Sequence, residues 1–210
     1  MPSKLLKRLG KKADKEMRRF DQLSHLSGTQ SDKMRRIFVL GRSKLKDDCI
    51  KFGEEHMKQR GIVNCPAFKP VLILTAPGAQ PQNPHLDQPG GRTGEDTYSV
   101  LAAVKIRQVN FKCRPSPISM QPGITVSWPA GGSRAMCHGG AGLGLHEEYS
   151  AGLHMFTGSG IDPKQLDGTW HCANATKANA PATSPTAAQP DPVFGFVRGV
   201  KPHHVHDPEA

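Results

Sequence analysis

The chain has 210 residues, of which 36% are hydrophobic and 6% aromatic, and its formal charge is +10. This length supports one compact domain of about 110 to 150 residues with appended segments. The five cysteines are odd in number and form no CxxC pair. A disulfide framework or a zinc module is therefore excluded as the organising principle, and a reducing intracellular compartment, the cytoplasm, is expected.

The positive charge is concentrated in the N-terminal segment. Residues 1–60 hold 17 Lys and Arg against 8 Asp and Glu, whereas residues 61–210 hold 11 against 10. Apolar residues at helical spacing predict a basic amphipathic helix over the first 20 residues and a second helix over 31–57, which Gly41 can interrupt. Such helices either pack on their own domain or bind an anionic partner, a membrane surface or nucleic acid. No apolar run is long enough for a signal peptide or a transmembrane segment, and organelle targeting stays open.

Three residues further along form a potential iron-binding set. His85 and Asp87 are two residues apart, and His138 follows the aspartate by 51 residues. Residues i and i+2 of an extended strand point to the same side, so one imidazole and one carboxylate share a face, and a second imidazole from a later strand completes it. Two histidines and one carboxylate that leave three coordination positions open are typical of mononuclear non-heme Fe(II) sites. The alternative is that all three are ordinary polar residues of loops.

Short strands separated by Pro- and Gly-rich turns surround this set. The strands are expected at 71–74, 98–104, 124–128 and 134–138. Many short strands at this spacing predict a mostly β fold of the jelly-roll, cupin-like type with helices at its N-terminus. The expected organisation is a basic helical segment at 1–62, a β domain at 63–172, a flexible linker at 173–192 and a C-terminal tail at 193–210.

The residues around the ligand set resemble a known family. The similar stretches are Pro84-His85-Leu86-Asp87, the strand at 98–104, His138-Gly139-Gly140-Ala141-Gly142 and Gly152-Leu153-His154. They resemble the Fe(II)- and 2-oxoglutarate-dependent dioxygenases of the prolyl-hydroxylase-like and phytanoyl-hydroxylase-like kind, over roughly residues 66–160. The resemblance implies a double-stranded β-helix over 63–172 with iron on His85, Asp87 and His138. It also implies that 2-oxoglutarate takes two of the open positions and that its oxidative decarboxylation drives hydroxylation of an unidentified small-molecule or peptidyl substrate.

One departure from the family concerns the distal carboxylate of 2-oxoglutarate. The family has a basic residue, usually arginine, a little over one strand after the distal histidine, whereas Gly152 stands there in this chain. A buried carboxylate needs a charged or multiply donating partner. Lys105 can supply it if its side of the strand faces the interior. Arg134, four residues before the distal histidine, is a second candidate, and Tyr98 is a further residue expected to bind the cosubstrate. The remaining alternative is that 2-oxoglutarate does not bind.

Other polar clusters and other functions compete with this hypothesis. A second set of potential metal ligands lies in the C-terminal tail, where no packed surroundings fix the imidazoles: His203, His204, His206 and Asp207. Further residues are interpreted as ordinary polar side chains: His146, Glu147, Glu148, His154 and His171. The two functional alternatives are a non-catalytic binding or interaction protein on a divergent cupin-like fold, and a metal-dependent oxygenase that does not use 2-oxoglutarate.

Overall fold

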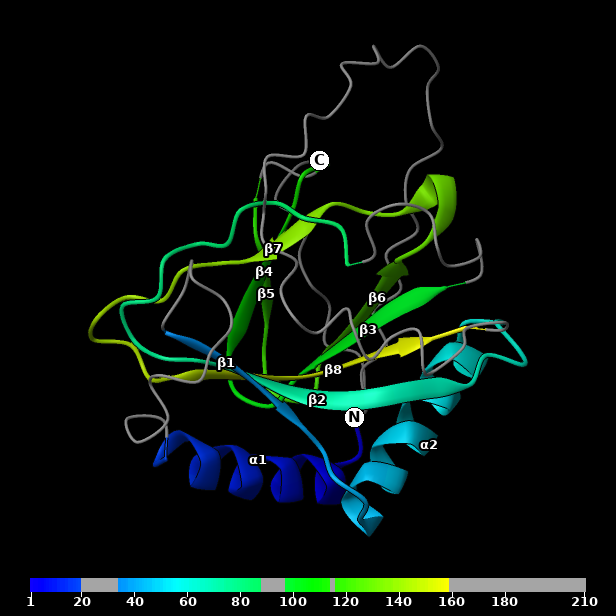
Figure 1. Cartoon of the computed structure of the whole chain (residues 1–210), viewed down its shortest axis with the longest axis horizontal. Coiled ribbons are helices and arrows are strands. Elements are labelled where there is room, and N and C mark those ends of the chain that lie inside the picture. The colour runs from blue at the N-terminus through cyan, green and yellow to red at the C-terminus, as the bar shows by residue number, and fades with distance from the viewer. Residues whose placement is uncertain (20–33, 88–96, 114–115, 159–210) are drawn as a thin grey trace, which may run out of the picture.

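A computed structural model describes residues 1–19, 34–87, 97–113 and 116–158 of the chain. These residues form three layers: a pair of helices, a five-stranded antiparallel sheet and a three-stranded antiparallel sheet (Figure 1). The helices are α1 (Ser3–Met17) and α2 (Lys44–Gln59), and a 3-10 turn, η2, spans Gly132–Arg134. The strands are β1 (Arg35–Val39), β2 (Ala67–Thr75), β3 (Tyr98–Ala103), β4 (Arg107–Phe111), β5 (Ile118–Met120), β6 (Thr125–Pro129), β7 (His138–Gly140) and β8 (Ser150–Thr157).

The large sheet has the strand order β1-β2-β8-β3-β6, which puts β8 at its centre. Every residue of β8 is buried, because the helices cover one face of the sheet and the small sheet covers the other (Figure 1). Strands buried on both faces are expected to appear in a sequence as continuous apolar runs rather than as alternating patterns. The runs in β2 and β3 have this character, and both strands were expected close to where they lie.

The small sheet, in the order β5-β4-β7, packs against the large sheet through a shared apolar cluster. Leu101 and Trp128 enter this cluster from the large sheet, and Val109, Phe111 and Met120 enter it from the small sheet. We call the surface of the large sheet that faces the small sheet its interior face. This mostly β fold with helices at its N-terminus confirms the predicted fold class. Within the described part of the chain, the two sheets are hydrogen-bonded separately and do not close into a barrel.

Helix α1 packs on the opposite face of the large sheet. Its residues Leu5, Leu9 and Ala13 recur at helical spacing and are buried against the sheet with residues such as Val100 and Leu153. The basic N-terminal segment therefore packs on its own domain, one of the two roles expected from its sequence. Among the described residues, no helix has both the length and the apolar character needed to cross a membrane.

Two local predictions were wrong. The helix expected over 31–57 is a strand followed by a helix, because Arg35–Val39 pairs with β2 as the edge strand of the sheet and α2 begins only at Lys44. The apolar spacing of this stretch fits a helix, and its pairing with a distant strand overrides that local pattern. The strand expected at 134–138 is also displaced, since η2 occupies Gly132–Arg134 and β7 begins at His138. The expected linker and C-terminal tail lie outside the described residues.

Candidate metal centre

The structure brings the three predicted iron ligands together. One ligand atom from each of His85, Asp87 and His138 lies within 4.8 Å of the others. Residues 85 and 138 form an antiparallel bridge, in which each backbone N–H donates to the other residue's carbonyl oxygen at 2.8 and 2.9 Å. This bridge fixes the loop before Asp87 against the first residue of β7. His138 thus comes from a later strand, whereas His85 and Asp87 lie in the loop after β2 and not on a strand as expected.

Each of the three side chains has a second polar partner on the side away from the centre. The Nδ1 atom of His85 lies 3.0 Å from the carbonyl oxygen of Asn83, and Nδ1 of His138 lies 3.1 Å from that of Met136. These carbonyl acceptors favour the tautomer with a proton on Nδ1, which leaves the Nε2 lone pair free to bind a metal. The Oδ2 atom of Asp87 accepts a hydrogen bond from the Ser99 hydroxyl. The donor set, two imidazoles and one carboxylate with oriented partners, fits a divalent iron ion.

The electrostatics of the centre couple Asp87 to His138. Burial acts to raise the pKa of Asp87, but the charge and hydrogen bond of His138, together with His154 and Ser99, outweigh burial and hold this pKa below its usual range. Burial acts to lower the pKa of His138, and the charge and hydrogen bond of Asp87 raise it above its usual value. The carboxylate is therefore ionised at neutral pH and available to a cation.

Aromatic rings enclose the histidine on the small sheet. The ring of Trp128 lies 4.6 Å from that of His138 between centroids, and the ring of Phe111 lies 6.0 Å away. The side chain of His138 is only 8% exposed, whereas His85 stands at the surface. The centre is thus apolar on its inner side and open to solvent on the side of His85, where a ligand can enter.

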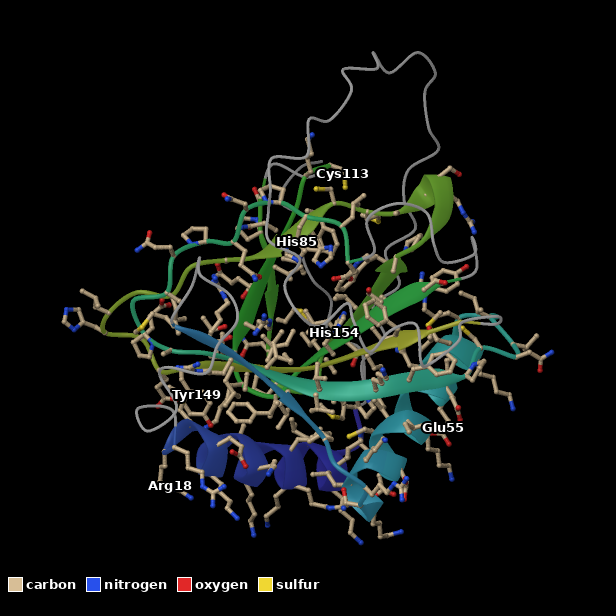
Figure 2. All side chains as sticks on the ribbon, viewed as in Figure 1. Arg18, Glu55, His85, Cys113, Tyr149 and His154 are labelled. Atoms are coloured by element: carbon tan, nitrogen blue, oxygen red, sulfur yellow. The ribbon has the colours of Figure 1, made fainter. Side chains whose placement is uncertain are left out.

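His154 is a third imidazole at the centre, in addition to His85 and His138. The sequence pattern offered little reason to place it there. It lies at the middle of β8 on the interior face, and its Nε2 atom is 3.8 Å from Oδ2 of Asp87. In the view of Figure 2, His85 lies above the large sheet, and His154 lies below His85, on β8 of that sheet. Burial lowers the pKa of His154 to about 4 despite the attraction of Asp87, so its imidazole is neutral. Its even spacing from Gly152 along a strand was the available signal.

The residues expected to bind 2-oxoglutarate are not gathered at this centre. Leu101 and Ala103 do face the interior, as that hypothesis required, but β3 ends at Ala103 and the alternation ends with it. The Nζ atom of Lys105 instead lies 3.5 Å from Oδ1 of Asp14 on α1 and 5.2 Å from the centre of the Tyr149 ring. Figure 2 shows Tyr149 between α1 and the large sheet.

The two other candidates also lie away from the three ligands. Arg134 is exposed at the end of η2. Tyr98 is half-buried and packs with the apolar cluster on the helix side of the large sheet. The stretch with His146 and Glu147 forms an exposed turn, in which the carboxylate of Glu147 accepts the N–H of Gly144. His171 and the histidine-rich tail lie outside the described residues.

An arginine that belongs to none of the predicted sets lies close to the centre. Arg107, the first residue of β4, points between the two sheets and is only 5% exposed. Its positive charge opposes the protonation of His138 and of His154, which puts it within electrostatic reach of the metal ligands. Its alternation with the apolar residues Val109 and Phe111 was the signal in the sequence.

The comparisons with known proteins agree with this architecture. No family model matches the chain, and no curated protein matches it by sequence. Its structure is similar to a prolyl-4-hydroxylase from Pseudomonas putida (TM-score 0.53, 15% identity, 75% of this chain and 88% of the other). It is also similar to AviO1 from Streptomyces viridochromogenes (0.50, 11%, 78% and 88%) and to EvdMO1 (0.56, 12%, 77% and 46%). The chain therefore shares the fold of the prolyl-4-hydroxylase and of these two further structures.

Proposed function

We propose that this protein is an Fe(II)-dependent oxygenase that uses 2-oxoglutarate and O2 to hydroxylate an as yet unidentified substrate. The observation that carries the proposal is the convergence of His85, Asp87 and His138, with ligand atoms within 4.8 Å of one another. The fold supports it, because the two histidines and the aspartate meet between the sheets of an oxygenase-like architecture. A site of this donor type binds Fe(II) and leaves three positions for cosubstrate and oxygen.

In this proposal each residue of the centre has a distinct task. His85, Asp87 and His138 hold the iron, which supplies the redox chemistry that couples 2-oxoglutarate decarboxylation to hydroxylation. The carbonyl groups of Asn83 and Met136 orient the two imidazoles. The hydroxyl of Ser99 orients the carboxylate of Asp87, and this orientation sets which carboxylate oxygen meets the metal.

A second candidate function keeps the metal and omits 2-oxoglutarate. The observation that favours it is the proximity of His154 to Asp87, 3.8 Å between Nε2 and Oδ2. If His154 served as a fourth ligand, an octahedral ion would keep two open positions, which are too few for a chelating 2-oxo acid and O2 together. In the 2-oxoglutarate mechanism, His154 stays outside the ligand set and serves as a neutral neighbour of Asp87.

Metal titration under anaerobic conditions tests the proposed centre. Co(II), whose visible spectrum reports its coordination, should bind the wild-type chain at one equivalent, and Fe(II) should compete for the same site. His85→Ala and Asp87→Ala should abolish this binding, while the matched control His146→Ala, on an exposed turn, should leave it unchanged. Oxygen uptake that depends on both Fe(II) and 2-oxoglutarate then separates the two candidate functions. Equal metal affinity in the wild type and in the Asp87 variant would overturn both.

We also propose an anionic partner for the exposed surface of α1. Four lysines at spacings of three and four residues are exposed along this helix, and we call them the basic face of α1: Lys4, Lys7, Lys11 and Lys15. The apolar side of α1 is occupied by the large sheet, so these lysines are presented to solvent by a helix that is itself anchored. A fixed row of cations suits an anionic membrane surface or a nucleic acid backbone.

A further inference from the structure

A buried guanidinium lies between the two sheets without a carboxylate. Among the described residues, none supplies an acidic partner to Arg107: Nη1 donates to the hydroxyl of Ser150 at a long 3.4 Å, and Nε has no hydrogen-bond partner. Burial and the neighbouring charge of Arg35 lower the pKa of Arg107 to about 10. A buried cation that meets another cation instead of an anion is costly unless a ligand provides the missing charge.

A second arginine converges on the same point. Arg35, on edge strand β1, is 6% exposed and donates from Nη2 to the carbonyl oxygen of Ala141 at 2.8 Å. A Cβ atom on Gly140 would lie 3.6 Å from Nε of Arg35 and 3.6 Å from Nη2 of Arg107. Both guanidinium groups therefore lie within van der Waals range of the same position on β7, where the tightest neighbour of an added Cβ would be Oε1 of Gln82 at 2.8 Å.

The space beside Arg107 is hollow. A cavity of about 60 Å³ is lined by Arg107 and Ser150, and its other walls include Thr75, Ala141 and the acidic residue Glu147. Thr75 and Ser150 are paired neighbours on β2 and β8, and Arg35 is paired with Thr75 on the other side. Arg107 and two hydroxyl-bearing residues thus line one small cavity, and the Glu147 carboxylate in its wall already accepts the N–H of Gly144. A guanidinium with neighbouring hydroxyl groups suits a carboxylate ligand.

The position of this cluster relative to the metal ligands is also informative. Gly140 is two residues from His138 on β7, and Gly152 is two residues from His154 on β8. Two residues along a strand correspond to about 7 Å, so the cluster lies about one strand repeat from the metal centre along β7 and β8. A dicarboxylate bound to the metal at one end can reach it with the other.

Arg107 occupies the space above the glycine that replaces the family's basic residue. A Cβ atom on Gly152 would lie 3.1 Å from Cδ and 3.4 Å from Nε of Arg107, and 2.9 Å from Cδ1 of Leu101. A side chain could not share this space with the arm of Arg107. β8 carries glycine where the family has a basic residue, and the guanidinium of Arg107, from β4 of the facing sheet, lies beside that glycine.

We propose that Arg107, with Arg35 beside it, binds the distal carboxylate of 2-oxoglutarate. The inference rests on the proposed function and adds the residue that fixes its cosubstrate. The fork of an arginine can pair with both oxygens of a carboxylate, and the hydroxyl of Ser150 provides a further donor beside it. A 2-oxo acid without a distal carboxylate, such as pyruvate, keeps only the metal-chelating half of the interaction.

Anaerobic binding of 2-oxoglutarate to the full-length, Fe(II)-loaded protein tests this inference, with the visible charge-transfer band as the readout. Arg107→Ala should lower the affinity for 2-oxoglutarate at least about 30-fold, which is the scale of the loss when one partner of a buried charge pair is removed. Its metal affinity should be unchanged, as measured separately with Co(II). Lys105→Met is the matched control, because it removes a cation that faces α1, and it should not alter 2-oxoglutarate binding. Arg107→Lys should give an intermediate loss.

The preference for 2-oxoglutarate over pyruvate gives a second readout that folding defects do not imitate. This preference should disappear in Arg107→Ala, and the double variant R107A/G152R, which returns a guanidinium to β8, should restore part of it. A wild-type preference retained in Arg107→Ala and in Arg107→Lys would overturn the inference and leave the proposed function standing. A wild-type protein that binds metal but no 2-oxoglutarate would overturn the cosubstrate of the proposed function itself, and a protein that binds no metal would overturn the centre.

Discussion

The Nε2 atom of His138 lies 3.4 Å from Oδ1 of Asp87. Adjacent ligands on a metal with bonds of about 2.1 Å lie about 3 Å apart, so these two atoms need to move only slightly to share an ion. In the absence of a cation the same two groups stabilise each other as a buried pair. The three side chains are therefore nearly preorganised for a metal ion. Metal affinity should then depend on the groups that orient them, such as the hydroxyl of Ser99.

The first prediction concerns the hydroxyl that orients Asp87. Ser99→Ala removes the hydrogen bond to Oδ2 and should weaken metal binding by about 10- to 100-fold, as is usual for the loss of an outer partner of a ligand. Co(II) titration measures the change. The control Ser119→Ala, on an exposed position of β5, should bind as the wild type does. Equal affinity of Ser99→Ala and the wild type would show that Asp87 needs no orienting partner.

The second prediction concerns the pH dependence of stability and arises from His56. Burial, with the nearby charge of Arg60, lowers the pKa of His56 to about 4 from an ordinary 6.5. Between these two pH values His56 is protonated in the unfolded chain but not in the folded chain. The free energy of unfolding therefore falls as the pH drops from about 6.5 to 4. The His56 contribution is at most about 3 kcal/mol.

Urea unfolding at a series of pH values measures this effect. His56→Gln should flatten the profile between pH 4 and 6.5, and the exposed His146→Gln serves as the matched control. Other buried groups titrate in the same window, so the comparison is between variant and wild type at each pH. A His56→Gln profile parallel to that of the wild type would contradict the assignment.

The third prediction uses two glycines that differ in their surroundings. A Cβ on Gly53 of α2 would overlap the sulfur of Met155, whereas a Cβ on Gly10 of α1 meets nothing within 4 Å. Gly53→Ala should destabilise the fold by about 1 to 3 kcal/mol through overpacking. Gly10→Ala should stabilise it by about 0.5 to 1 kcal/mol, because alanine is the better helix former. Thermal unfolding measures both, and changes of the same sign would contradict the packing of α2 on β8.

The fourth prediction tests the basic face of α1. Replacing Lys7, Lys11 and Lys15 by glutamate should abolish salt-sensitive retention on vesicles that contain anionic lipid, or on DNA, without changing metal binding. The matched control replaces three exposed lysines of α2: Lys44, Lys51 and Lys58. The control should retain binding if the basic face of α1 is the docking surface. Wild-type protein that binds neither vesicles nor DNA would leave α1 with its packing role alone.

The fifth prediction concerns the histidine-rich tail. Deleting residues 173–210 should leave the Co(II) spectrum unchanged, since the proposed ligands all lie before residue 140. Loss of the spectrum on this deletion would identify the tail cluster as the metal site. A matched full-length variant with His203, His204 and His206 changed to alanine separates the loss of ligands from the loss of chain.

The fold class was predictable, and the ligand set could be proposed, because both depend largely on local patterns. The pair His85 and Asp87 depends on a spacing of two, and the strands depend on short apolar runs bounded by glycine and proline. β1 was missed because its helical apolar spacing is overridden by pairing with β2, a contact that no local window contains. Arg107 was missed for a related reason, since its meeting with Gly152 depends on how two sheets face each other.

The three proposed ligands belong to different halves of the sandwich. His138 opens β7 of the small sheet and is bridged to His85, while Asp87 is hydrogen-bonded to Ser99 on β3 of the large sheet. An ion bound by all three residues would link the two sheets and so stabilise the packing of the small sheet on the large sheet. Amide hydrogen exchange in β4 and β7, which reports opening of the small sheet, should therefore be faster in the metal-free protein than in the metal-bound protein.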